Sequence, residues 1–172
     1  MKKGLWIIRI SFMIILCGKS FFSLAQTPTD SLPGDPGAIS VYTVQNMSFG
    51  AFAQSGTGGT VTISNAGARS ATGSIVQLNY GYTYFQSIFE IEGPVGTIIS
   101  IMNGPDATLT GSNGGTISLH IGDSNPTSPF STTVTPPTRT QVNIGGTITV
   151  TGNSGSPPGS YTGSFYITFN QE

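Results

Sequence analysis

Two glutamates, Glu90 and Glu92, form the most closely spaced pair of carboxylates in the chain. Residues two apart on a strand project from one face, about 7 Å from each other. Glycosidases also use two carboxylates, but they place them on opposite sides of a cleft, which a same-strand pair cannot do. Carboxylate oxygens are calcium ligands as well, so Glu90, Glu92, Asp106 and Asp123 are the candidate calcium residues. The alternative is that both glutamates face solvent, and we expect no cofactor.

His120 is the only histidine, and it alternates with apolar residues in the run 117–121. That position predicts an exposed side chain on a strand. A serine nucleophile needs a base and an orienting acid, and no Gly-x-Ser-x-Gly sequence opens a helix in this chain. The chain is therefore not expected to be an enzyme.

The first twenty-five residues have the composition of a cleaved signal peptide. Lys2 and Lys3 precede an apolar run at 10–17, and Ser23-Leu24-Ala25 is a small-x-small site, which predicts cleavage between Ala25 and Gln26.

Two alternatives to a cleaved peptide are a retained membrane anchor and a lipid attached to Cys17. The apolar run is far shorter than the ~20 residues that span a bilayer. Ile14, Ile15 and Leu16 precede Cys17, where lipoprotein signals carry a small residue. We therefore expect an exported protein without a membrane span, on the outer surface of a Gram-negative bacterium after transit through the periplasm.

Beyond residue 25 the chain has neither lysine nor cysteine. Its two arginines there, Arg69 and Arg139, and its seven acidic residues give a formal charge of −5. So few cations exclude nucleic acid as a partner. Without cysteine the chain has no disulfide, although export would permit one. The remaining length suits one domain.

Residues 26–37 contain Pro28, Pro33 and Pro36 and predict a flexible lead-in. From 38 to 172, short stretches alternate apolar and polar residues between glycine-rich turns, a pattern typical of strands. The expected strands are 39–44, 47–52, 59–63, 74–78, 82–91, 96–101, 115–119, 141–144, 146–150 and 164–169. This favours one all-β, immunoglobulin-like (pilin-like) antiparallel β-sandwich, with a closed barrel as the alternative.

Two blocks of residues carry a family resemblance. They are Gly59 to Ser64 with Gly67, Arg69, Ser70 and Gly73, and Gly145 to Val150 with Gly159, Tyr161, Thr162, Gly163 and Phe165; Phe49 and Gly50 add to them. Together they resemble the bacterial domain-of-unknown-function family numbered 4402, a group of short secreted proteins. Residues 103–137 depart from the pattern and indicate longer loops. In the motif Gly67, Arg69, Ser70 we expect a structural role, with Arg69 bonding carbonyls or an acid.

That family is similar in general shape to fimbrial subunits. The resemblance implies a structural or adhesive surface subunit assembled by strand exchange, with identical or related subunits and a periplasmic chaperone as partners. The expected assembly edge is Gly159, Phe165, Ile167 and Phe169, and the possible donor segment is Ile39 and Val41. Alternatively, residues 39–44 pair inside their own sheet.

Surface glycans are the alternative partner, which would make the chain a non-catalytic binding module. Tyr80, Tyr82 and Tyr84 would share one face of a strand and offer flat rings to a sugar, with Phe85 on the other face. The competing interpretation is that these rings only pack on the sheet.

Overall fold

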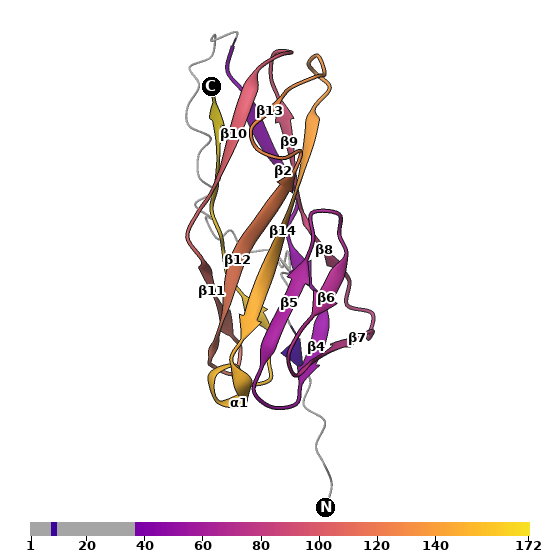
Figure 1. Cartoon of the computed structure of the whole chain (residues 1–172), viewed down its shortest axis with the longest axis vertical. Helices are drawn as coiled ribbons and strands as arrows, with labels where there is room; N and C mark the ends of the chain where they lie inside the picture. The colour runs from indigo at the N-terminus through magenta and orange to yellow at the C-terminus, as the bar shows by residue number, and fades with distance from the viewer. Residues whose placement is uncertain (1–7, 10–36) are drawn as a thin grey trace, which may run out of the picture.

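The computed structural model describes residues 8–9 and 37–172 and is built from antiparallel strands, with one helical turn, α1 (Gly152–Gly155). Figure 1 shows the strands running along the length of the molecule. The predicted all-β, immunoglobulin-like sandwich is confirmed at the level of fold class. The expected cleavage site and nearly all of the expected signal peptide and lead-in lie outside the described residues.

The largest sheet is organised around one long strand, β14 (Thr140–Val150). One side of β14 pairs with β12 (Thr116–Asn125). On its other side, residues 140–144 pair with β9 (Ser87–Glu92) and residues 146–150 pair with β5 (Gly59–Ile63). The sheet continues through β2 (Ser40–Gln45) beside β9, β6 (Arg69–Ala71) beside β5, and β11 (Ala107–Gly111) and β15 (Tyr161–Thr162) beyond β12.

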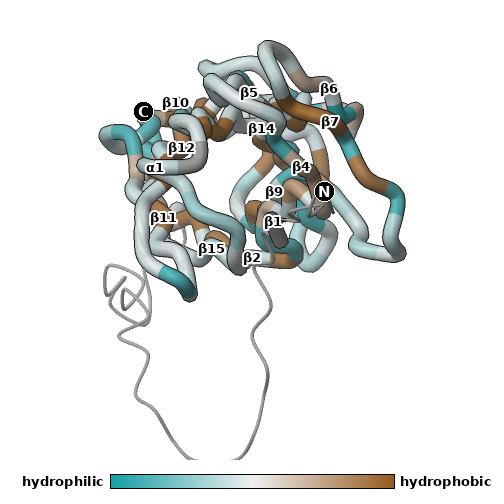
Figure 2. The backbone as a smooth tube through the Cα atoms, turned by 90° about the horizontal axis from the view of Figure 1, so that it is seen from below, coloured by the Kyte–Doolittle hydropathy of each residue, from teal (hydrophilic) through white to brown (hydrophobic). Residues whose placement is uncertain are grey.

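Three small sheets complete the fold. They are β1 (Ile8–Arg9), β4 (Ala51–Gln54) and β7 (Ile75–Leu78); β13 (Phe130–Ser131), β10 (Ile98–Asn103) and β16 (Ile167–Gln171); and β3 (Ser48–Phe49) with β8 (Tyr84–Phe85). Seen end-on in Figure 2, the strands surround a common interior. Phe52 of β4 and Ile99 of β10 join Val61 and Ile148 of the large sheet in one buried cluster.

Alternation of side chains explains why these segments are strands. Along β12, Ile117, Leu119 and Ile121 are buried while Ser118 and His120 are exposed. The inward apolar residues therefore form the core. The outward positions are often threonine, which favours strands and carries no charge.

The expectation of longer loops across residues 103–137 is wrong, because β11, β12 and β13 lie there. The reason is the weak apolar signal of β11. Only Ala107 and Leu109 face inward on this strand, and threonines occupy its outward positions. The expected strand 82–91 is also divided, into β8 and β9.

Tyr161 holds the turn that leads into β15. Its side chain is fully buried, and its hydroxyl donates a hydrogen bond to the carbonyl of Pro157. A tyrosine that bonds the backbone a few residues upstream is a recurring feature of immunoglobulin-like sandwiches. Burial raises the pKa of the Tyr161 phenol above its ordinary value, because the charged phenolate would be desolvated.

Alkaline pH is therefore expected to weaken the fold through Tyr161. Its raised pKa contributes stability that is fully present below the unfolded pKa of about 10 and is lost as pH rises through the folded pKa. The Tyr161→Phe variant should lose about 1 kcal/mol at neutral pH, with the hydrogen bond. Urea unfolding followed by circular dichroism, between about pH 8 and pH 11, should show a smaller alkaline loss for this variant than for wild type.

The matched control is Tyr166→Phe, because Tyr166 is 60% exposed and lies five residues further along the same terminal segment. This control should keep the wild-type pH dependence. Identical alkaline losses in wild type and Tyr161→Phe would contradict the role given to the buried phenol.

Candidate functional site: a seam between the first and last strand runs

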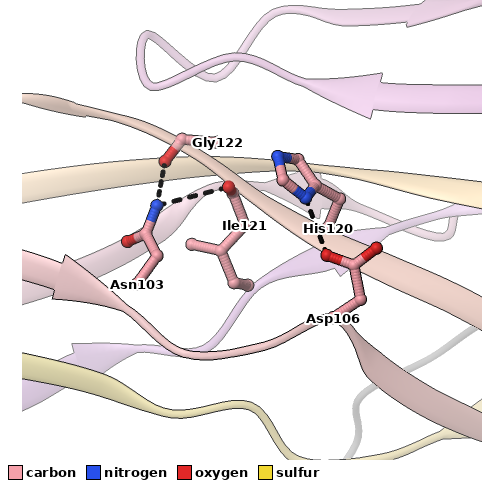
Figure 3. Close-up of polar contacts among 5 residues, drawn as sticks. All are labelled: Asn103, Asp106, His120, Ile121 and Gly122. Carbon is pink, nitrogen blue, oxygen red and sulfur yellow. Dashed lines mark hydrogen bonds and ion pairs between the residues drawn. The ribbon is translucent and has the colours of Figure 1, made fainter.

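His120 and Asp106 form a pair on the outward face of the large sheet (Figure 3). The Nδ1 atom of His120 lies 2.7 Å from Oδ1 of Asp106, and the two side chains are 70% and 59% exposed. Nearby, Nδ2 of Asn103 donates to the carbonyls of Ile121 and Gly122 at 3.3 and 3.1 Å. In the part of the chain that the structure describes, no serine hydroxyl is bonded to His120. The contacts attach the β10–β11 connection to β12, and they do not build a nucleophile–base–acid arrangement.

Glu90 and Glu92 both bind Arg139. Its Nη1 lies 3.2 Å from Glu90 Oε2 and its Nε lies 3.0 Å from Glu92 Oε2. The guanidinium carbon also lies 3.7 Å from the centre of the Tyr42 ring. Hydrogen bonds to Glu92 and then to Glu90 raise the pKa of Arg139 above its ordinary value. The outward pair of carboxylates therefore shares one cation, which lies just before β14.

The candidate calcium residues are not brought together. Asp106 bonds His120, and Glu90 and Glu92 bond Arg139. Among residues 37–172, no three histidine, cysteine, aspartate or glutamate side chains gather where they could hold a metal ion.

The three tyrosines of the expected glycan platform do not share one strand. Gly81 has a φ of 77°, which interrupts extended structure between Tyr80 and Tyr82, and only Tyr84 lies in a strand. Tyr80 and Tyr84 are 53% and 44% exposed. The Arg69 guanidinium lies 4.3 Å from the centre of the Tyr84 ring and covers part of it. A continuous tyrosine stripe is therefore absent from the sheet.

Arg69 anchors the junction between β3 and β4. Its Nη1 donates to the carbonyls of Phe49 and Ala51, both at 3.2 Å, and its Nη2 donates to the carbonyl of Leu78 at 3.3 Å. The chain turns at Gly50 with a φ of 68°, and a Cβ there would lie 2.8 Å from Nη1. Burial lowers the pKa of Arg69, and Tyr84 opposes that shift. Of the two arrangements open from the sequence, bonding of carbonyls is the one observed.

A shallow hollow of about 740 Å³ lies at one end of the sandwich, between residues 56–60 and 149–154. Glycine, threonine and serine supply nearly all of its lining, and none of the lining residues is titratable in the physiological range. It therefore offers hydrogen-bonding groups but no acidic or basic side chain.

The remaining candidate is the line along which the two ends of the domain meet. We call residues 37–54 the first run, residues 156–171 the last run, and the line between them the seam. Gln171 Nε2 donates to the Gly37 carbonyl at 2.6 Å at one end of the seam. Gln54 Nε2 donates to the Ser156 carbonyl at 2.9 Å at the other end. The two runs therefore lie antiparallel, joined at both ends.

No strand pairing joins the two runs between these end contacts in the described residues. β15 pairs with β11 and β16 pairs with β10, so each strand of the last run has one paired edge. On the first run, β2 pairs with β9, and β4 pairs with β7 and with the two residues of β1. Figure 2 places β1 and β2 on the same side of the molecule as β15.

Apolar side chains line the seam. Phe165, Ile167 and Phe169 of the last run are half-buried and pack on the core, and the Phe169 ring lies 5.4 Å from that of Phe89. A narrow apolar hollow opens between the runs. It is lined by Met47, Ser48 and Phe49 of the first run, Tyr161 and Phe165 of the last run, and Leu109 and Leu119 beneath them.

The residues expected to form an assembly edge all belong to the last run. Gly159 lies in the bend before β15, where a Cβ would lie 2.9 Å from Ser112 Oγ. Ile39 and Val41 do not form a free donor segment. Val41 lies opposite Ile91 in the β2–β9 pair, so it pairs inside its own sheet, as in the alternative left open by the sequence. Ile39 precedes β2 and packs on the core.

The fold and the seam define an all-β, immunoglobulin-like sandwich whose outer strands meet without pairing. Within that class, the chain belongs to the family described as domain of unknown function DUF4402, whose model matches residues 39–170. The match includes the stretch 103–137 that the motif comparison left out. No curated protein and no solved structure matches the chain. In the described residues, no helix has the length and apolar character to cross a membrane.

Removing Arg69 should destabilise the fold much more than removing Arg139. The Arg69→Ala variant leaves the carbonyls of Phe49, Ala51 and Leu78 without their donor, and half-buried acceptors without partners cost about 1–3 kcal/mol. The Arg139→Ala variant removes two solvent-accessible ion pairs and a contact with the Tyr42 ring, and surface interactions of this kind contribute little. Chemical unfolding of both variants tests this, and equal destabilisation would contradict it.

Proposed function

We propose that the chain is an exported cell-surface subunit, structural or adhesive, that joins its assembly by accepting a β-strand along the seam. The observation that carries this proposal is that the first and last runs lie antiparallel, are bonded at both ends, and are not paired between them. A strand edge of this kind presents free N–H and C=O groups to any extended chain that fits beside it.

The chemistry of the two edges supports the proposal. Proteins commonly protect edge strands with charged side chains, proline or inward-pointing charges. Residues 38–54 and 160–171 contain none of these: no lysine, arginine, aspartate, glutamate or proline occurs in either segment. Both edges of the seam are thus unprotected against strand addition, although the chain has eleven prolines elsewhere.

The proposed location rests on the leader and on the outward surface. The signal-like residues 1–25 direct export, and uncharged hydroxyl side chains on outward strand positions suit an extracellular setting. A periplasmic chaperone is the natural cover for the seam during transit, because an open apolar edge promotes aggregation. This is the arrangement of a fimbrial or adhesive subunit.

The glycan-binding alternative has less support. Its platform required three tyrosines on one strand face, and Tyr80, Tyr82 and Tyr84 do not lie on one strand. The seam, in contrast, is seen along two whole runs of backbone, which pair with other strands and not with each other.

A charge placed inside the seam should block assembly. In the Phe165→Lys variant, an inward-pointing ammonium group occupies the rim of the hollow, where it would be desolvated by an added strand. Expressed with its leader in a Gram-negative host together with its native gene neighbours, the wild-type chain should begin at Gln26 and be accessible to protease added outside the cells. It should also be recovered in a high-mass complex, which Phe165→Lys should lose.

The control is Phe130→Lys, because Phe130 is also a half-buried phenylalanine of the core but lies on β13, away from the seam. This variant should lose a similar amount of thermal stability and keep the complex. Retention of the complex by Phe165→Lys, or a wild-type chain that stays inside the cell with its leader attached, would contradict the proposal.

A further inference from the structure

We infer that the seam receives a strand from a different polypeptide, along the edge of β4, and not from residues 26–37 of a second copy of this chain. This inference rests on the proposed function and names the partner of that site. It makes the chain a receiving subunit, which ends or anchors an assembly instead of extending it with copies of itself.

The edge of β4 is the place where the structure already carries an added strand. β1 lies antiparallel to it, with Ile8 opposite Phe52 and Arg9 opposite Ala51. Ile8 and Arg9 belong to the segment expected to be removed at Ala25–Gln26. All four residues of β4 are buried in the structure, which includes β1. Once the segment that contains β1 is removed, β4 keeps β7 on one side, and its other edge is open to another strand.

A buried acceptor lies at the end of this edge. Gln54, the last residue of β4, donates through Nε2 to the Ser156 carbonyl, which joins the two runs. Its Oε1 atom is buried and has no hydrogen-bond partner among the described residues. Such an atom is costly in a finished fold, because it has lost water and gained no donor. An N–H group of an incoming strand is the donor that this position lacks.

Residues 26–37 have the wrong chemistry to supply the strand. They contain Pro28, Pro33 and Pro36, which cannot donate backbone hydrogen bonds, and Leu32 is their only large apolar residue. The next segment is already used, since residues 40–45 pair with β9. A second copy therefore has no free, alternating segment to offer from the start of its domain.

The partner strand can be described by its chemistry. It is extended, free of proline over about five residues, and antiparallel to β4, with apolar residues at alternate positions. On the face toward the interior it carries no charge, because the β4 residues that it would pair with, Ala51 and Phe52, are fully buried in an apolar core. Backbone hydrogen bonds supply affinity, and the alternate apolar side chains supply selectivity.

The chain itself provides a probe for this edge. A peptide with the sequence of residues 5–13 contains Ile8 and Arg9 and the only tryptophan, Trp6. The exported chain that begins at Gln26 has no tryptophan, so all tryptophan fluorescence reports the peptide. The exported protein is recovered from the periplasm and titrated with this peptide, with its Ile8→Pro variant, and with a peptide of residues 26–38.

The 5–13 peptide should bind with a blue shift of Trp6 emission and raise the Tm by roughly 8 °C at about a hundred times its Kd. Its Ile8→Pro variant and the 26–38 peptide should leave the Tm unchanged, and the protein alone should sediment as a monomer. Phe165→Lys should weaken binding of the 5–13 peptide by about tenfold or more, and Phe130→Lys should not.

Two other results separate this inference from the proposed function. In the first, the 26–38 peptide stabilises the protein as much as the 5–13 peptide does, or the protein alone forms fibres. The seam then accepts a strand from a second copy of this chain, so the inference is wrong but strand addition along the seam is retained. If neither peptide binds and Phe165→Lys still assembles on cells, strand addition itself fails.

Discussion

The seam exists because two runs of strands are brought close and do not pair with each other. Two glutamine side chains join the runs at their ends, Gln54 to Ser156 and Gln171 to Gly37. Between those contacts the first run pairs with β9, β8, β7 and the two residues of β1, and the last run pairs with β10 and β11. The phenylalanines of the last run stay half-buried, because no strand of the first run pairs beside them in the described residues.

Period-two alternation was enough to predict the fold class and most strands, but glycine was harder to interpret. The strand at 59–63 coincides with β5, whereas 141–144 and 146–150 are one strand, β14. The break expected at Gly145 does not occur, and a Cβ on Gly145 would lie 2.4 Å from the Ile63 carbonyl oxygen. This glycine allows close approach at the point where β14 exchanges its partner β9 for β5.

The contacts of charged residues could not be predicted in the same way, because their partners are far away in sequence. Arg139 meets Glu90 and Glu92 only because β9 pairs with the start of β14. His120 reaches Asp106 through the pairing of neighbouring strands. The sequence could show the inward face of the last strand, since alternation is local, and the absence of charge and proline in residues 38–54 and 160–171.

That absence is the strongest link between the sequence and the proposed function. A chain with seven acidic residues and eleven prolines has enough of both to protect two edges, and it places none in residues 38–54 or 160–171. The two arginines beyond residue 25 are used elsewhere: Arg69 anchors the β3–β4 junction, and Arg139 binds two glutamates. An edge without protection promotes aggregation in an isolated protein, so it is tolerable only where another chain covers it. Under the function proposed above, a chaperone in transit and a partner strand afterwards would satisfy that requirement with one and the same surface.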